Sequence, residues 1–295
     1  MPLEVVAHDE VARYVERVRP VLRRDEARNN LPLGVLWQLE HSDIYDEWHL
    51  FTVEERDEIV GVFLRTPPWP WNVTVAGDRD PVEVSAVVAD HLAVTGAEPA
   101  EVNGAAGVAE LVAHGWAEAI GGLADQQMAM RVMSCEEVQM PPAPTGRRRR
   151  ATVGDVELVR DWLVLFQGEV FDREVEDIDG LEDRIRRSLS EDQHGTWLWE
   201  DDDQVVSLTA IGRPTGTGER IAPVFTPAAH RGRGYAGRLV AEVTADGFDR
   251  GLSHVFLFTD AANPVSNALY ERLGYHVVGD AAIWSVSTVA SGTSR

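Results

Sequence analysis

Arginine and glycine alternate in one short segment, Arg231-Gly232-Arg233-Gly234-Tyr235-Ala236. The segment follows a β-rich run at 221–226 and opens an amphipathic helix. Glycine N–H groups, the positive end of the helix dipole and the flanking Arg231 therefore converge on one place. Such a place suits a pyrophosphate, so the sequence predicts a nucleotide-like cofactor in the C-terminal half.

Periodicity and turn residues predict the elements that must position this segment. Before it we expect two helices and three strands, with an acidic turn joining the first two strands. After it we expect a helix, a buried strand and a helix capped by Asn263, and two short strands that close the domain. The expected ranges are 153–167, 181–189, 196–200, 205–211, 219–226, 234–249, 254–259, 263–274, 275–278 and 283–288.

The N-terminal half repeats this order of elements. A break rich in proline and glycine at 141–146 is followed by four arginines at 147–150, which we expect to pair with nearby carboxylates. A length of 295 residues also favours two domains. We therefore expect domains at 1–140 and 151–295 with a linker at 141–150. The ranges expected in the first half are 10–24, 49–53, 59–65, 72–76, 82–94, 98–103, 105–120 and 127–133.

Composition excludes several classes of protein. The formal net charge of −22 argues against nucleic-acid binding, because phosphates would be repelled by most of the surface. No run approaches the length of a membrane-spanning helix and the N-terminus lacks an apolar signal core, so we expect a cytoplasmic protein without a membrane partner. Cys135 is alone, which predicts a buried thiol and no metal site.

The glycine segment allows two interpretations of the cofactor that it binds. Gly232, Gly234 and Gly237 satisfy the G-x-G-x-x-G fingerprint of dinucleotide-binding folds. In those folds the strand runs almost directly into the first glycine, whereas here 227–231 intervene. Too little chain follows Gly237, moreover, to complete a doubly wound sheet. The dinucleotide reading is therefore the weaker one.

The second reading accounts for more residues. The segments 224–227, 231–236 and 263–275 together resemble the GNAT N-acetyltransferase superfamily over about 150–288. The resemblance implies an α/β fold with two GNAT-like lobes, each a mixed, mostly antiparallel sheet with splayed central strands. It implies acetyl-CoA as acyl donor, with no metal. The implied cofactor contacts are Val224, Phe225, Thr226, Arg231, Gly232, Arg233, Gly234, Tyr235, Ala236, Gly237, Asn263 and Asn267.

Amine acetylation also needs an acid and a base. Tyr270 occupies the position of the family's general acid, and a phenol is a competent proton donor to a departing thiolate. A backbone N–H near Val224 or Phe225 can stabilise the oxyanion. For the base we consider Glu219 and Glu200, and we expect Glu169 and Asp172 to lie over the acceptor pocket.

The N-terminal half has lost these features. Leu111 stands where the second half has Tyr270, and the loop at 77–81 holds one glycine, two aspartates and a proline. We expect this degenerate lobe to be structural.

The resulting hypothesis is an N-acetyltransferase that moves an acetyl or short acyl group from acyl-CoA to an amine in a ternary complex. The acceptor is a small molecule or an amino group of a peptide or protein. Alternatives are a non-catalytic acyl-CoA sensor and an enzyme resembling mycothiol synthase. Oligomeric state stays open, with a homodimer as one option.

Overall fold

A computed structural model describes residues 2–190 and 195–288. The chain forms two compact units, which we call the first and the second unit. Residues up to Val132, together with 260–262 and the chain from Val278 on, belong to the first unit. Residues 133–259 and 263–277 belong to the second. The units are therefore not sequential, and strands β6 (Gly122–Cys135) and β12 (His276–Thr288) both run across the division.

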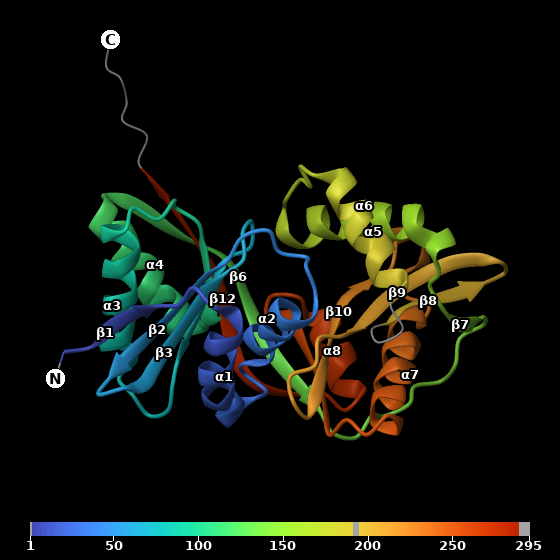
Figure 1. The fold of residues 1–295 in the computed structure, drawn as a ribbon. Coiled ribbons are helices and arrows are strands. Elements are labelled where there is room, and N and C mark those ends of the chain that lie inside the picture. Colours follow the sequence, from blue (N-terminus) through green and yellow to red (C-terminus); the bar gives the residue numbers. More distant parts are fainter. Residues whose placement is uncertain (1, 191–194, 289–295) are drawn as a thin grey trace, which may run out of the picture. The chain divides into compact units, whose positions relative to one another are not determined.

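In the first unit a mixed sheet carries helices on both faces (Figure 1). Its strand order is β1-β2-β3-β4-β5-β12, and of these neighbours only β4 and β5 are parallel. The helices α3 and α4 share one core with the sheet, and α1 and α2 share another. Bounds are β1 Glu4–Ala7, α1 Val11–Leu22, α2 Asn30–His41, β2 His49–Glu55, β3 Glu58–Arg65, β4 Trp71–Val75, α3 Pro81–Val94, β5 Glu101–Ala105 and α4 Ala106–Ile120.

The second unit has the strand order β11-β10-β9-β8-β7, in which only β10 and β11 are parallel. Helices α5 and α6 cover one face and α7 the other (Figure 1). Bounds are β7 Arg147–Arg150, α5 Val156–Phe171, α6 Ile178–Ser190, β8 Gly195–Asp201, β9 Gln204–Gly212, β10 Gly218–Phe225, α7 Tyr235–Asp249, β11 His254–Asp260 and α8 Pro264–Arg272.

Two cores hold the second unit together. Leu239, Val240 and Val243 of α7 are fully buried against Ile221 of β10 because apolar residues recur on one face of the helix. On the opposite face, Phe225 packs with residues of α5 and α6, and its ring meets Trp162 edge to face. The side chains of β10 thus contribute to both cores, which fixes this strand in the middle of the unit.

The expected mixed, mostly antiparallel α/β fold is confirmed, with three local differences. Strand β1 and helix α2 were not predicted. The two short strands expected to close the C-terminal domain are instead one strand, β12, and the expectation that they close that domain is wrong. Residues 281–285 of β12 pair antiparallel with β5 in the first unit. The sequence pattern could show a strand there but not its neighbour.

The arginine run of the expected linker forms strand β7, which pairs with β8. As predicted, its side chains meet carboxylates. Arg149 holds Asp155 through two hydrogen bonds of 2.8 and 2.9 Å and also donates to Glu200 at 2.7 Å. Arg148 pairs with Asp246 at the end of α7. The run therefore ties the edge of the second unit's sheet to its helices.

None of the helices within the described residues is long and apolar enough to cross a membrane. The same residues contain no group of three or more His, Cys, Asp or Glu side chains placed to hold a metal ion. Cys135 is buried, as predicted, and burial raises the pKa of its thiol to about 12. A thiol with this pKa stays protonated and unreactive near neutral pH.

The Arg149–Asp155 pair leads us to predict how the stability of the fold depends on pH. Hydrogen bonds from Arg149 lower the pKa of Asp155 from 3.8 to about 2. A carboxyl group whose pKa is lower in the folded protein than in the unfolded chain stabilises the fold at pH values above its unfolded pKa. This stabilisation is lost as the pH falls from about 4 toward 2. We expect Asp155→Asn to cost about 2 kcal/mol in the free energy of unfolding at pH 7, measured by urea denaturation, and less at pH 3.

The matched control is Asp161→Asn, because Asp161 also pairs with an arginine but has a side chain that is 62% exposed. Exposed pairs contribute little, so this variant is expected to lose less than about 0.5 kcal/mol. Equal losses for the two variants, or a loss for Asp155→Asn that does not shrink at low pH, would contradict the prediction.

Candidate functional site

The predicted glycine loop lies between β10 and α7 and is open to solvent. Gly232 and Gly234 have φ angles of 75° and 86°, in the left-handed region that favours glycine. No atom lies within 4 Å of the position that a Cβ would take at either residue. The backbone of the loop is therefore accessible to a ligand that approaches closely.

The N-terminus of α7 is not capped by a side chain. Its N-cap residue is Gly234, and its first turn contains no acidic residue. The helix runs for 15 residues, so its dipole places partial positive charge at this end. Free N–H groups, two open glycines and the exposed Arg231 and Arg233 meet here, as the sequence predicts. The arrangement favours a di-anionic group.

Strands β10 and β11 are paired at one end only. Parallel pairing joins 218–220 to 254–256 and stops there. Directly after it, the register of β10 against β9 shifts between Ile221 and Val224. Pro223 lies in this irregular stretch and has no N–H to offer to a neighbouring strand. The expected opening between these two strands is therefore present, and it lies on the side of β10 that leads to the glycine loop.

Two hydroxyl groups of β9 hold the end of β10. Thr209 donates to the carbonyl oxygen of Pro223 at 3.0 Å, and Ser207 donates to that of Phe225 at 3.2 Å. Both carbonyls therefore face β9. Because successive residues of a strand direct their backbone groups to alternate edges, we expect the N–H and C=O of Val224 to face the opening toward β11. These groups can hydrogen-bond an extended ligand.

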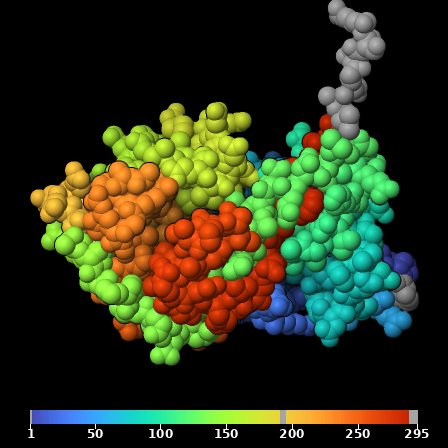
Figure 2. All heavy atoms as spheres, turned by 180° about the vertical axis from the view of Figure 1, so that it is seen from behind, coloured from blue at the N-terminus to red at the C-terminus, as the bar shows by residue number. Residues whose placement is uncertain are grey.

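Tyr270 lies in α8, in the same core cluster as Tyr235 of α7. Only 7% of its surface is exposed, and burial raises the pKa of its phenol. The two helices pack closely, since a Cβ at Gly237 would approach Leu269 Cδ1 to 2.9 Å. Figure 2 shows the surfaces of α7 (orange) and α8 (red) adjoining on one face. Tyr270 is thus a protonated phenol held by packing.

The remaining predicted cofactor residues have identifiable structural partners. The Oδ1 atom of Asn263 accepts from the N–H of Ser266 at 3.1 Å, so this residue caps α8 as predicted. Asn267 lies one turn later and is buried. The hydroxyl of Thr226 is 2.9 Å from that of Ser207. Ala236 is half-buried in the first turn of α7.

Both carboxylates considered as bases are engaged in ion pairs. Glu219 binds Arg250 at 2.7 Å and lies in the paired part of β10. Its five-residue separation from Val224 corresponds to roughly 16 Å of regular strand. Burial raises the pKa of Glu219, and Arg250 opposes this shift. Glu200 binds Arg149 at 2.7 Å. The structure thus does not bring either carboxylate into contact with the open end of β10.

Arg231 of the loop has two partners. Its Nε donates to the carbonyl of Thr226 at 2.8 Å, and its guanidinium pairs with Glu169 of α5. Glu169 therefore lies beside the glycine loop. Asp172, expected with it over the acceptor pocket, is the C-cap residue of α5. His230 precedes the loop, is half-buried and has an Nδ1 atom without a hydrogen-bond partner among the described residues.

Sequence reasoning missed the role of Asp201, which positions the loop. The hydroxyl of Tyr235, the first residue of α7, donates to the carboxylate of Asp201. Asp201 ends β8 and also accepts from Thr145 at 3.0 Å. The acidic turn at 201–203 is predicted from sequence only as a hairpin turn. Its contact with α7 follows from the position of the helix over β8 and β9, which no local pattern shows.

The corresponding place in the first unit is built differently. Strands β4 and β5 are also parallel and the loop after β4 also leads into a helix, α3. Here, however, the carboxylate of Asp80 accepts from the N–H of Val82 at 2.9 Å and caps the helix. Pro81 supplies no N–H, and Glu83 adds negative charge to the first turn. A phosphate is disfavoured at this end of α3.

Comparison with known proteins agrees with this geometry. Residues 156–275 match the acetyltransferase (GNAT) family model. This segment runs from the start of α5 to the residue before β12 and includes the glycine loop and Tyr270. No curated protein matches the chain significantly.

Solved structures resemble the chain over nearly its whole length. One is a GCN5-related N-acetyltransferase from Sphaerobacter thermophilus, with a TM-score of 0.62, 18% identity and coverage of 99% of this chain and 98% of that one. Another is a Drosophila protein with a TM-score of 0.68 and 13% identity, covering 97% and 98%. A third is a tandem GNAT protein of clavulanic acid biosynthesis, with a TM-score of 0.57 and 12% identity, covering 97% and 98%. At these identities the similarity shows the fold.

The Tyr235–Asp201 contact is testable by a double-mutant cycle. A hydrogen bond to a charged group contributes about 1.5–3 kcal/mol, and partial exposure reduces this. We expect Tyr235→Phe to cost about 1.5 kcal/mol in the free energy of unfolding, and less than half of that in an Asp201→Asn background. Urea denaturation of the four proteins measures the coupling.

Tyr45→Phe serves as the matched control, since the hydroxyl of Tyr45 donates to the neutral Gln38 at 2.8 Å. The loss for Tyr45→Phe is expected to be the same with and without Asp201→Asn, because Tyr45 donates to Gln38 within the first unit. Additive losses for Tyr235→Phe and Asp201→Asn would show that the contact does not hold α7.

Proposed function

We propose that this chain, whose domain at 156–275 belongs to the acetyltransferase (GNAT) family, transfers an acetyl group from acetyl-CoA to an amino group. The transfer is direct, with both substrates bound together. One observation carries the proposal: β10 separates from β11 beside an uncapped helix N-terminus, with Tyr270 in the adjoining helix.

The residues present fit the diphosphate of coenzyme A. The open Cβ positions at Gly232 and Gly234 leave room for phosphate oxygens against the backbone. The uncapped first turn of α7 offers N–H groups and the positive end of its dipole. Arg233 is exposed and supplies positive charge, while Arg231 must exchange its contact with Glu169 to do so. The backbone of Val224 can hydrogen-bond the amide-containing arm of coenzyme A.

The chemistry follows from these positions. Acetyl-CoA supplies an activated acyl group as a thioester, whose C–S bond breaks while the C–N bond to the acceptor forms. We expect the N–H of Val224 to stabilise negative charge on the carbonyl oxygen. Tyr270 Oη gives its proton to the departing sulfur. Its raised pKa keeps this proton in place at neutral and moderately alkaline pH.

Both carboxylates considered as the base are held in ion pairs. The acceptor must lose a proton before its nitrogen attacks. For Glu219 to take this proton, its ion pair with Arg250 must open. We infer that the acceptor reaches the open end of β10 as the neutral amine. The proton that its nitrogen carries after the C–N bond forms passes to water, and water returns a proton to the Tyr270 phenolate. The first unit, whose α3 is capped by Asp80, is proposed to be structural.

Release of coenzyme A in the presence of a panel of amines tests the function. A general acid commonly contributes about 100-fold or more, so we expect kcat of Tyr270→Phe to fall about 100-fold on any amine that is acetylated. The dissociation constant of acetyl-CoA, measured by calorimetry, is expected to change less than about twofold.

Tyr45→Phe is the control, because Tyr45 lies in the first unit and its exchange leaves the site intact. A Tyr270→Phe variant that keeps the kcat of the wild type would overturn the role of this phenol. Tight binding of acetyl-CoA with no turnover on any amine would instead support the non-catalytic acyl-CoA sensor.

The glycine loop gives a separate prediction for binding. At Gly234 an alanine is strained by about 1–2 kcal/mol because φ is 86°, and its methyl group points into the space assigned to phosphate. We expect Gly234→Ala to raise the dissociation constant of acetyl-CoA at least about 10-fold, which corresponds to about 1.4 kcal/mol.

Gly251, just after the other end of α7, is a closely matched control. Its φ is 97° and no atom lies within 4 Å of its Cβ position. Gly251→Ala therefore carries the same backbone strain far from the loop. We expect it to lower Tm about as much as Gly234→Ala does and to leave the affinity for acetyl-CoA unchanged. Equal affinities for the two variants would place the diphosphate elsewhere.

A further inference from the structure

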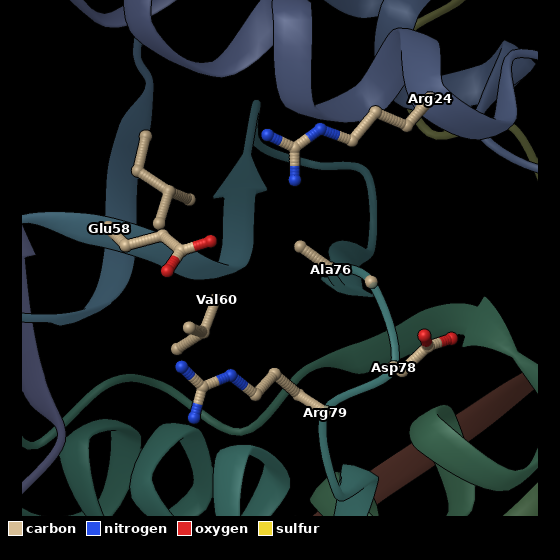
Figure 3. A pocket seen from close by; sticks show the side chains of 8 residues that line it. Arg24, Glu58, Val60, Ala76, Asp78 and Arg79 are labelled. Carbon is tan, nitrogen blue, oxygen red and sulfur yellow. The ribbon is translucent and has the colours of Figure 1, made fainter.

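A cavity of about 180 Å³ lies in the first unit, where the loop after β4 meets the β2–β3 hairpin and the end of α1 (Figure 3). Its lining is mixed, because the largely buried Ile59, Val60 and Ala76 lie beside charged side chains of both signs. The charged residues that matter here are Arg24, Glu58 and Arg79.

The two arginines of the lining differ in their partners. Arg79 is bound to Glu55 at 2.6 Å, so its charge is largely neutralised. Arg24 makes no ion pair or side-chain hydrogen bond with any residue between 2 and 288 that the structure describes. Its guanidinium is directed into the cavity in Figure 3. One free cation therefore faces this space.

Glu58 is the matching free anion. Its carboxylate points toward the cavity from another side in Figure 3 and makes no ion pair within the described part of the chain. Asp78 in the loop adds a second carboxylate to the lining. Arg24 and Glu58 are thus opposite charges that face one cavity without pairing with each other. A ligand that carries both charges can satisfy both groups.

Charge also excludes the cofactor of the second unit from this cavity. The adjacent N-terminus of α3 is capped by Asp80, and Pro81 lacks an N–H. The lining residues carry two positive and two negative charges in total, so a polyanion gains little there. The space of about 180 Å³ is open to solvent on one side and accommodates a small molecule. The ligand is small and has no net charge.

We propose that this cavity binds a small zwitterion, an α-amino acid with a short side chain. Its carboxylate binds the guanidinium of Arg24, its ammonium group binds Glu58, and its side chain lies on Val60 and Ala76. The site lies entirely within the first unit and is independent of acetyl transfer.

Titration of the full-length protein with L-alanine, followed by methyl NMR signals of Ile59, Val60 and Ala76, tests the proposal. We expect saturable shifts with a dissociation constant of about 1 mM, which corresponds to about 4 kcal/mol. Acetate and methylamine each carry only one of the two charges. Each is expected to bind at least about fivefold more weakly than L-alanine.

Arg24→Gln and Glu58→Gln are each expected to weaken L-alanine binding at least about fivefold. The matched controls are Arg13→Gln and Glu16→Gln, which remove exposed charges on α1 outside the cavity. Absence of saturable shifts, equal binding of acetate or methylamine, or equal losses in the control variants would each overturn the proposal. Tyr270→Phe is expected to leave L-alanine binding unchanged, so this test does not depend on the proposed enzyme activity.

Discussion

The separation of β10 from β11 is the constraint on which the site of the second unit depends. Parallel pairing holds only 218–220 against 254–256. Pro223 cannot extend the ladder, and the hydroxyls of Ser207 and Thr209 draw the neighbouring carbonyls toward β9. From these contacts we expect the N–H and C=O of Val224 to face away from β9. A regular sheet would use the same backbone groups internally and leave none for a ligand.

The glycine loop is held from two sides around this opening. Tyr235 is bound to Asp201 at the end of β8, and Gly237 brings α7 close to Leu269 of α8. Arg231 donates a hydrogen bond to the carbonyl of Thr226 and forms an ion pair with Glu169 of α5. A loop with exposed glycines is mobile unless its ends are fixed, so these contacts preorganise the backbone N–H groups. Preorganisation reduces the entropy lost when a ligand binds.

The first unit shows what the same order of elements does with other residues. Its strands β4 and β5 repeat the parallel arrangement, yet Asp80 occupies the helix N-terminus that Gly234 leaves open in the second unit. A carboxylate at this position satisfies the N–H group that a phosphate would need. The residues at the start of each helix thus leave the N–H groups of α7 uncapped, whereas Asp80 already caps α3. The cavity beside Arg24 and Glu58 is a different feature, lined by residues of β3, of the loop after β4 and of the turn that follows α1.

The sequence by itself determined the features that rest on local chemistry. The glycine loop, the cap at Asn263, the ion pairs of 147–150 and most helices and strands follow from residue types and short spacings. Only the tertiary structure decided which segments meet: β12 joins β5, Asp201 meets Tyr235, and Glu219 meets Arg250. Caps and turns are set within a few residues, whereas strand partners and ion pairs across the fold depend on packing between segments far apart in the chain, which no local pattern encodes.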